Sequence, residues 1–453
     1  MIDKLPNDID ELKAIIKMLL ERIEKLEAEN AELRRRLDLN SENSHKPPSS
    51  DGLQKKPAFP RDKNNKNGGQ KGHKGNTLRK VDNPDIITWH NPKNCSCCGR
   101  NFHDNEIESF KSRQVFDLPP QKLIVTEHRV GSINCCGTEH KGDFPQEVIN
   151  TTQYGSGVSA LCVLLSVQYC LPLDKISQLF EDLYGYSINS STIINNLENV
   201  YQLLEPIEEQ IKQKLLEEKV VHADETGVRV EGKLHWLHTA CSEEYTYLFI
   251  NPSRGKGALY SEQSLIKDFK NYLVHDCWAS YFLFDECQHI ICNAHILREL
   301  TGLIDTGSNW ALQMHSLLSE CYYSDKPPDK LYERYDAILI LADEQEPAPI
   351  HNGRGRPKQS VGRCLSNRLQ KYKTGILAFV FDKTIPFTNN QAERDIRCVK
   401  IKLKVSGTFR TTSGANYYTR IQSFISTLRK QSFDVFYHLQ ALINNPSHLI
   451  SLG

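Results

Sequence analysis

The sequence predicts a multidomain protein in which an N-terminal coiled coil, a small cysteine-containing β module and a helical segment precede an α/β domain with a helical insertion. Three observations support this prediction. The chain has 453 residues, which exceeds the length of one ordinary domain. Residues 1–40 carry a heptad pattern, and the second half alternates β-branched runs with helical periodicity. The hydrophobic fraction of 39% and the charged fraction of 25% are ordinary for a globular chain.

Residues 1–40 repeat isoleucine and leucine at coiled-coil spacing. Position a of the heptad is mainly isoleucine and position d is leucine: Ile9, Ile16, Ile23, Asn30 and Leu37, with Leu12, Leu19, Leu26 and Leu33. This combination favours a parallel two-stranded coiled coil, and a single Asn at position a fixes its register. Arg22 would pair with Glu27, and Glu29 with Arg34, across the dimer. The pattern predicts a homodimer or higher oligomer; the alternative is an amphipathic helix packed on its own chain.

Residues 41–87 are predicted to form a basic, flexible linker, because they are rich in Ser, Pro, Gly, Asn and Lys. Residues 54–80 contain nine Lys or Arg and one Asp, and residues 394–410 contain six and one, although the formal net charge of the chain is zero. Such local basic stretches are typical of phosphate-binding proteins. The linker is therefore either a solvated spacer or a non-specific contact to DNA phosphates, and both interpretations can hold.

Residues 88–150 contain two cysteine clusters. Cys95 and Cys98 have the spacing and the following glycine of a zinc half-site, and Cys135 and Cys136 form the second cluster. The intervening stretch QVFDLPPQKLIVTEHRV alternates as a β-segment does. We predict a small zinc-binding β module; the alternatives are a site that has lost its metal and, less economically in a reducing compartment, disulfides.

Residues 151–217 read as all-helical. One helical run ends at Gly185, and Ser190 is expected to cap the next helix. The two helices are either a helix-turn-helix that reads DNA or a brace beneath the following sheet.

Residues 218–430 open with three consecutive β-type runs, followed by two more strands and a helix. The order predicts a mixed sheet. A long, mainly helical stretch follows, which we interpret as an insertion over about residues 300–385, and residues 431–453 are predicted to form a helical tail.

Three acidic residues in this region have informative contexts. Asp224 lies in a β-branched run, Asp276 ends a second apolar run, and Glu393 follows good helix N-capping residues at 388–390. Carboxylates from two strands and a helix suit a pair of Mg²⁺ ions acting at phosphorus. Within CQHIICNAH, by contrast, cysteine and histidine alternate along a strand and cannot all converge on a metal, so core packing or hydrogen bonding to the site is favoured.

Resemblance to a known family rests on five stretches: DETGVRV, HDCWASY, CNAHILREL, NNQAERDIR and KVSGTFR. In their order, spacing and residue identities, these stretches resemble those of the transposases of the insertion-sequence sixty-six family, which belongs to the DDE class. The resemblance covers nearly the whole chain. The resemblance implies an RNase H-like catalytic domain in which Asp224, Asp276 and Glu393 hold two Mg²⁺ or Mn²⁺ ions. It also implies one structural Zn²⁺, with Cys136 and either Cys135 or His140 completing the site, although adjacent cysteines depart from the family's spaced pair.

The implied activity is binding the ends of an insertion sequence and catalysing DNA strand cleavage and strand transfer. The expected partners are element ends, target DNA and a second copy of the chain; a need for accessory proteins stays open. Candidate DNA contacts are the basic residues of an AT-hook-like loop and those that follow Glu393: Arg354, Arg356, Lys358, Arg394, Arg397, Lys400, Lys402 and Lys404. The alternatives are an inactive zinc-dependent DNA-binding regulator and an RNase H-like nuclease without strand transfer.

No run of 18 apolar residues and no apolar signal core are present in the sequence. We therefore expect no membrane association and a cytoplasmic, nucleoid-associated protein.

Overall fold

The computed structural model describes residues 8–38, 40, 43, 44, 78–349, 357, 359–445 and 452. The chain divides into two compact units, a larger one within residues 1–52, 127–182 and 186–453 and a smaller one within residues 53–126 and 183–185. In these described ranges, no helix has the length and apolar character needed to cross a membrane.

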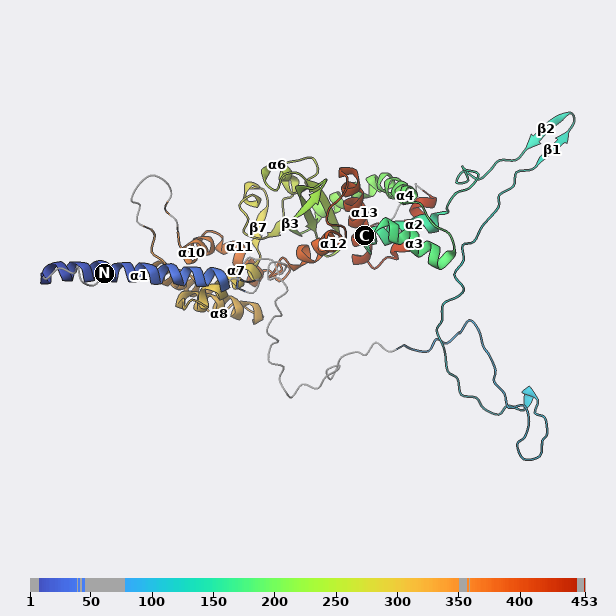
Figure 1. Ribbon diagram of the computed structural model, residues 1–453, viewed down its shortest axis with the longest axis horizontal. Coiled ribbons are helices and arrows are strands. Elements are labelled where there is room, and N and C mark those ends of the chain that lie inside the picture. The colour runs from blue at the N-terminus through green and yellow to red at the C-terminus, as the bar shows by residue number, and fades with distance from the viewer. Residues whose placement is uncertain are drawn as a thin grey trace. The chain divides into compact units, whose positions relative to one another are not determined.

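The larger unit contains a five-stranded mixed sheet in the order β5-β4-β3-β6-β7; Figure 1 labels two of its strands, β3 and β7. The first three strands form the expected antiparallel meander, and β6 and β7 run parallel to β3. The turn from β3 to β4 has two residues with positive φ, Glu231 and Gly232, as a tight hairpin requires. The strands are β3 (Val220–Val230), β4 (Lys233–Cys241), β5 (Thr246–Asn251), β6 (Tyr272–His275) and β7 (Gln288–Ile291).

Two apolar clusters hold the sheet and its helices together. The first joins β3, β4 and β5 to helices from both ends of the sequence, and Phe424 and Ile211 are among its fully buried members. The second joins β6 and β7 to the helices within residues 293–381, around the fully buried Trp310 and Tyr335. The insertion therefore has an apolar core of its own.

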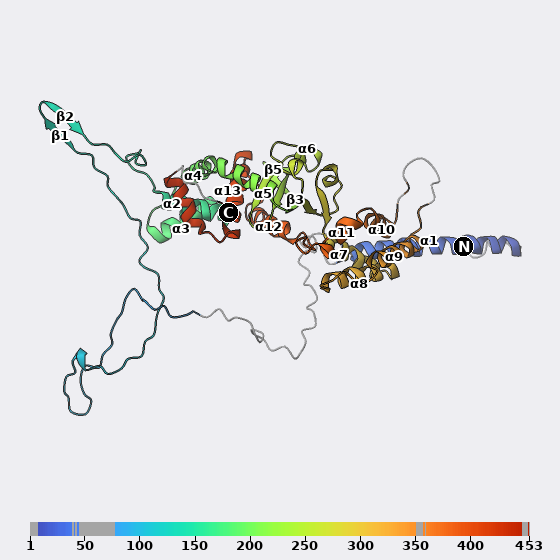
Figure 2. The same ribbon diagram turned by 180° about the vertical axis from the view of Figure 1, so that it is seen from behind.

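Helices of the first cluster lie before and after the sheet in sequence. α12 packs against β3 and β4, α13 against β5, and α14 against α2; α12, α13 and α2 are labelled in Figures 1 and 2. Their bounds are α2 (Ser156–Val167), α4 (Ser190–Leu203), α5 (Glu205–Glu217), α12 (Asn390–Ser406), α13 (Thr412–Lys430) and α14 (Val435–Asn444). Between α2 and α4 lies α3 (Leu173–Tyr184), which contributes no residue to this cluster.

Residues 151–217 are helical as predicted, but two details differ. The first helical run is broken between α2 and α3, where Cys170 has a positive φ and Pro172 precedes α3. The cap of α4 is Asn189 rather than Ser190: the Asn189 side chain accepts the N–H of Ser191. Ser190 is the first residue of the helix instead, because the extended backbone of Asn189 places its carboxamide over the free N–H groups.

The second cluster contains the predicted helical insertion. Its four helices pack in sequence, each on its neighbour, and α7 leads into them from β7. The bounds are α7 (Asn293–Ile304), α8 (Asn309–Tyr323), α9 (Leu331–Gln345), α10 (Val361–Lys371) and α11 (Lys373–Phe381). The AT-hook-like residues Arg354, Arg356 and Lys358, between α9 and α10, lie outside the described residues.

Short helices lie in the segments that connect β5 to β6 and β6 to β7. They are α6 (Lys256–Leu259), η4 (Ile266–Asp268) and η5 (Tyr281–Leu283), and a further one, η3 (Asp104–Glu106), lies in the smaller unit.

The N-terminal helix α1 (Ile9–Asp38) covers most of the predicted coiled coil. Its heptad isoleucines are exposed, with Ile9 at 67%, Ile16 at 55% and Ile23 at 49%. Leu19 and Leu26 at position d are exposed as well. A long helix with an exposed apolar stripe is what one strand of a coiled coil presents before it meets its partner.

Between residues 88 and 150 the only strands among the described residues are β1 (Ser132–Cys135) and β2 (Thr138–Lys141), which form a hairpin. The β-segment expected at residues 114–130 is not a strand, so that prediction was wrong. Alternation alone does not make a strand, since an extended segment needs a neighbour to pair with. Apolar side chains of this segment are exposed, among them Val115 and Ile124.

Candidate active site

Asp224 lies in the middle of β3, the central strand of the sheet. Its neighbours in the strand alternate as expected, with Ala223 and Glu225 buried on either side. The Asp224 carboxylate is half-buried, and its Oδ1 accepts the N–H of Glu225 at 2.9 Å. The most protected strand of the sheet therefore fixes the position of this carboxylate.

Asp276 follows directly after β6, the parallel neighbour of β3. Because the two strands run in the same direction and pair from Val220 with Tyr272 onward, their carboxyl-terminal halves meet at one edge of the sheet. Asp276 Oδ1 accepts the N–H of Trp278 at 3.1 Å, which fixes the carboxylate in the loop after the strand.

Glu393 lies in the first turn of α12, where the positive end of the helix dipole favours a carboxylate. Because α12 packs on β3 and β4, this turn is held against the strand that carries Asp224. His295 of α7 faces it, with Nε2 3.9 Å from Glu393 Oε1. That oxygen is buried, and it has no hydrogen-bond partner in the part of the chain that is described.

Electrostatics link the three carboxylates. Burial, followed by the negative charges of Glu225, Asp276 and Glu393, raises the pKa of Asp224 well above its usual range. Three predicted site residues from two strands and a helix are thus close enough to act on one another. In the described ranges they do not converge to the distances of a ready metal site.

The donor set and the charge nevertheless fit Mg²⁺ or Mn²⁺. All three side chains offer carboxylate oxygens, the ligands that these ions prefer. The buried Glu393 Oε1, which has no hydrogen bond among the described residues, is an acceptor that a cation would satisfy, and mutual repulsion at Asp224 is the condition that a divalent charge relieves.

Asn389 ties the elements of the site together, and sequence reasoning had assigned it only as a helix-capping residue. It is the N-cap position of α12, but no side-chain cap bond forms. Its Oδ1 lies 2.9 Å from His222 Nδ1, its Nδ2 donates to the carbonyl of Ala223 at 2.8 Å, and its N–H donates to Cys292 Sγ at 3.1 Å. The buried Asn389 therefore connects strand β3, helix α12 and the start of α7.

A second group beside the aspartates was also missed. The Glu225 carboxylate, next to Asp224, is buried and accepts bonds from Arg254 and from the Tyr281 hydroxyl. Burial first, and then the charge of Asp276, raises the pKa of Glu225. The sequence signals for this group were the positions of Glu225 within DETGVRV and of Tyr281 within HDCWASY, whereas Arg254 lies in a loop outside these motifs.

The histidines and cysteines of CQHIICNAH make hydrogen bonds around the site. His289 Nδ1 lies 3.0 Å from His275 Nε2, and His289 Nε2 lies 2.9 Å from the carbonyl of Phe284. Cys292 is buried at the start of α7, where it accepts the N–H of Asn389. Cys292 and His295 thus lie beside Asn389 and Glu393 and take part in positioning the site.

The basic residues after Glu393 divide between two faces of α12. The exposed ones are Arg394, Arg397, Lys400 and Lys404. Lys402 is different: its side chain is largely buried, its Nζ donates to the carbonyl of Ser166 at 3.3 Å, and burial lowers its pKa. The amine of Lys402 is therefore directed toward α2, whereas the other four predicted DNA contacts of α12 face solvent.

The first zinc half-site is a formed tight turn in the smaller unit. The N–H of Cys95 donates to the carbonyl of Arg100 at 2.8 Å, and the N–H of Gly99 donates to the carbonyl of Cys95 at 3.0 Å. Gly99 has a φ of 73°, which favours glycine. Hydrogen bonds from the backbone of Cys98 and then of Cys97 lower the pKa of the Cys95 thiol, and such bonds favour the thiolate that binds metal.

The second cysteine cluster lies at the tip of the β1–β2 hairpin in the larger unit. Cys136 and Gly137 are the two turn residues, with φ of 54° and 77°. The register pairs Ile133 with His140, so Cys135 and His140 lie on the same face of the hairpin. Both therefore stay open as the fourth zinc ligand.

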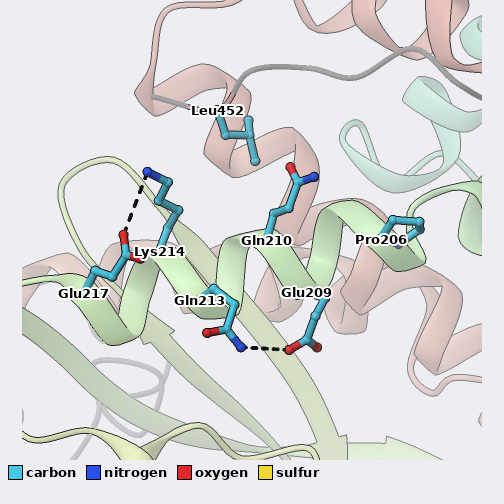
Figure 3. A pocket seen from close by; sticks show the side chains of 7 residues that line it. All are labelled: Pro206, Glu209, Gln210, Gln213, Lys214, Glu217 and Leu452. Carbon is cyan, nitrogen blue, oxygen red and sulfur yellow. Dashed lines mark hydrogen bonds and ion pairs between the residues drawn. The ribbon is translucent and has the colours of Figure 1, made fainter.

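A cavity of about 270 Å³ lies elsewhere, along α5 (Figure 3). No residue of the carboxylate group contributes to its lining, which consists of Pro206, Glu209, Gln210, Gln213, Lys214, Glu217 and Leu452.

Comparison with known proteins identifies the class to which this chain belongs. A family model described as "Transposase IS66 family" matches residues 151–417, more than half of the chain. A second, described as the zinc-finger binding domain of transposase IS66, matches residues 92–137, and a family of unknown function matches residues 2–79. The chain belongs to the IS66 family of transposases. A search of curated proteins finds no match.

Proposed function

We propose that this protein binds the ends of an insertion sequence and catalyses metal-dependent DNA strand cleavage and strand transfer. The proposal rests mainly on one observation: Asp224 on β3, Asp276 after β6 and Glu393 on α12 come from separate elements, and the charges of Asp276 and Glu393 add to burial and to the charge of Glu225 in raising the pKa of Asp224. The strand order, with two antiparallel strands on one side of β3 and two parallel strands on the other, supports assignment of the sheet as RNase H-like.

Asp224, Asp276 and Glu393 would hold two Mg²⁺ or Mn²⁺ ions. When bound, such a pair activates the attacking oxygen, from water or a DNA 3′-hydroxyl, and stabilises the departing oxygen at phosphorus. The chain's contribution is position. Strand β3 holds Asp224, the backbone of Trp278 anchors Asp276, and Asn389 fixes the first turn of α12 that carries Glu393.

The exposed face of α12 supports binding of the DNA strand beside the reacting phosphate. Arg397, Lys400 and Lys404 follow Glu393 by four, seven and eleven residues, a spacing that places all four on one face of a helix. A strand whose phosphate lies at Glu393 would therefore pass along three cations, and Arg394 lies beside this row.

The N-terminal regions would bring two active sites and two element ends together. The family's zinc-finger domain covers Cys95, Cys98 and Cys136, and we propose that these thiolates, with Cys135 or His140, hold one structural Zn²⁺. The exposed heptad stripe of α1 supports a homodimer. Each transposition event joins two ends, so a dimer supplies one active site for each.

A strand-transfer assay tests the proposal directly. Labelled duplexes from the DNA flanking the coding sequence are incubated with the protein, target plasmid and Mg²⁺, Mn²⁺ or Ca²⁺. We expect joined products with Mg²⁺ or Mn²⁺, and binding without joining in Ca²⁺, whose looser coordination places the reacting oxygens poorly. Cleavage without joining would indicate a nuclease instead, and specific binding without cleavage in any metal would indicate a regulator.

A further inference from the structure

Arg254, in the loop between β5 and α6, is enclosed by two indole rings. Its guanidinium carbon lies 4.7 Å from the centre of the Trp236 ring and 4.5 Å from that of the Trp278 ring. Trp236 belongs to β4 and Trp278 follows Asp276, so the rings come from different elements. Stacking of a guanidinium on aromatic faces holds its plane in a fixed orientation.

One edge of the same guanidinium is bound to Glu225. Arg254 Nε and Nη2 donate to Glu225 Oε1 at 3.0 and 2.8 Å, and the Tyr281 hydroxyl donates to Oε2 at 2.7 Å. The Glu225 side chain is only 1% exposed, whereas the Arg254 side chain is 42% exposed. The pair therefore has a buried anchor and a cationic end that reaches solvent.

This group is connected to both aspartates through adjacent backbone. The N–H of Glu225 donates to Asp224, and the N–H of Trp278 donates to Asp276. Arg254 is thus held by one residue that neighbours Asp224 and by another that lies two positions after Asp276. Any strand whose phosphate reacts at the aspartates would pass within reach of such a fixed cation.

We propose that Arg254 binds a phosphodiester of the DNA strand next to the reacting phosphate. The inference rests on the proposed function, since it takes DNA as the substrate. Within the described residues Nη1 makes no hydrogen bond, so donors remain on the side away from Glu225. The guanidinium is held between two indole rings and bonded to Glu225 along one edge. Its remaining N–H donors therefore lie in a fixed plane, which matches the bidentate binding of two phosphate oxygens.

The test is the salt dependence of DNA binding, measured with labelled duplexes from the flanking DNA. Each phosphate contact adds about 0.9 to the slope of log K against log salt concentration. Arg254→Gln should weaken binding and lower the magnitude of the slope by about 0.9. Arg254→Lys should keep the slope but bind more weakly than the wild type, because a lysine cannot form the planar fork.

Arg334→Gln is the matched control. Arg334 on α9 has a 43% exposed side chain and is paired with Glu320, so it resembles Arg254 in exposure and in having a carboxylate partner. The salt slope of the Arg334→Gln variant should equal that of the wild type. A purely structural role, in which Arg254 only neutralises Glu225, predicts a different outcome. In that case, Glu225→Gln combined with Arg254→Gln restores the wild-type slope, which would overturn the inference.

The same samples separate this inference from the proposed function. Strand transfer by the wild type tests the function, and the slope difference between Arg254→Gln and the wild type tests the contact. A wild type that binds but does not join strands counts against the function alone. If the wild type joins strands but Arg254→Gln has the same slope as the wild type, the result counts against the contact alone.

Discussion

At the scale of single residues, Asn389 is the contact through which the strand of Asp224 meets the helix of Glu393. Asn389→Ala leaves the carbonyl of Ala223 and the ring of His222 without this partner. An unsatisfied buried group costs about 1–3 kcal/mol, so we expect the free energy of unfolding to fall by that amount in denaturant titrations.

Cleavage should fall in Asn389→Ala even where the protein remains folded, because Glu393 loses its orientation. Asn390→Ala is the control, since Asn390 is the exposed next residue, and it should retain both stability and cleavage. Equal stability and equal cleavage rates for the two variants would refute the positioning role of Asn389.

Two lysines of α12 provide a second test at this scale. Lys404 is exposed on the face of Glu393, while Lys402 is partly buried and its Nζ donates to α2. Lys404→Gln should weaken DNA binding and reduce its salt slope by about 0.9. Lys402→Gln should leave the slope unchanged, as measured by fluorescence anisotropy over a range of salt concentrations; a smaller slope for Lys402→Gln would show that Lys402 contacts a phosphate.

The position of Lys402 shows what residue types alone could not settle. Lys400, Lys402 and Lys404 alternate with apolar residues, and in a strand they would share one face. The segment is helical, so the middle lysine turns to the opposite side. The three carboxylates were predictable because each stood in a distinctive local context, whereas Arg254 and the role of Asn389 depend on contacts between segments distant in sequence.

At the scale of elements, α1 has a clear prediction. A peptide of residues 1–40 should be helical and dimeric by circular dichroism and sedimentation equilibrium. Asn30→Ile should raise its melting temperature while allowing higher oligomers, because an Asn at position a trades stability for specificity. A monomeric, unfolded peptide at high concentration would instead favour the packing of α1 on its own chain.

The zinc module gives the second prediction at this scale. Residues 88–150 expose many apolar side chains, and a small metal domain gains its folding free energy from the ion. The purified protein should contain about one zinc per chain by elemental analysis, and Cys98→Ser should release it and weaken end binding. Cys97→Ser should keep the metal; specific end binding by a zinc-free wild type would contradict the proposal.

Strands and helices were predictable where the sequence pattern matched tertiary packing. The meander of β3, β4 and β5 was predicted because β-branched runs are separated by short polar turns. The segment at 114–130 has similar alternation but pairs with no strand. Pairing depends on a neighbour that alternation does not reveal.

At the scale of the whole molecule, strands β3 to β5 belong to one apolar core and strands β6 and β7 join the insertion in another, and the site lies where the elements of both meet. Asp224 and Glu393 come from elements of the first core, while Asp276 follows β6 and His295 belongs to α7, elements of the second. The order of elements along the chain was predictable from periodicity. Their meeting around Asn389 was not, because it depends on how two cores pack.

The central claim is that three carboxylates act as one metal-binding unit. Asp224→Asn, Asp276→Asn and Glu393→Gln should each reduce strand transfer on the order of 10³-fold or more while leaving end binding intact. Double variants should be no worse than single ones, because the three act together. Asp285→Asn is the suitable control, since Asp285 is exposed, whereas Asp395 is bonded to Lys430 and Glu225 to Arg254.

The most direct measurement is strand transfer by purified Glu393→Gln beside Asp285→Asn, on the same labelled ends in Mg²⁺. We expect Glu393→Gln to bind the ends but form no joined product, while Asp285→Asn joins them at close to the wild-type rate. Joined product from Glu393→Gln at the wild-type rate would show that Glu393 does not act with the two aspartates at the metal site.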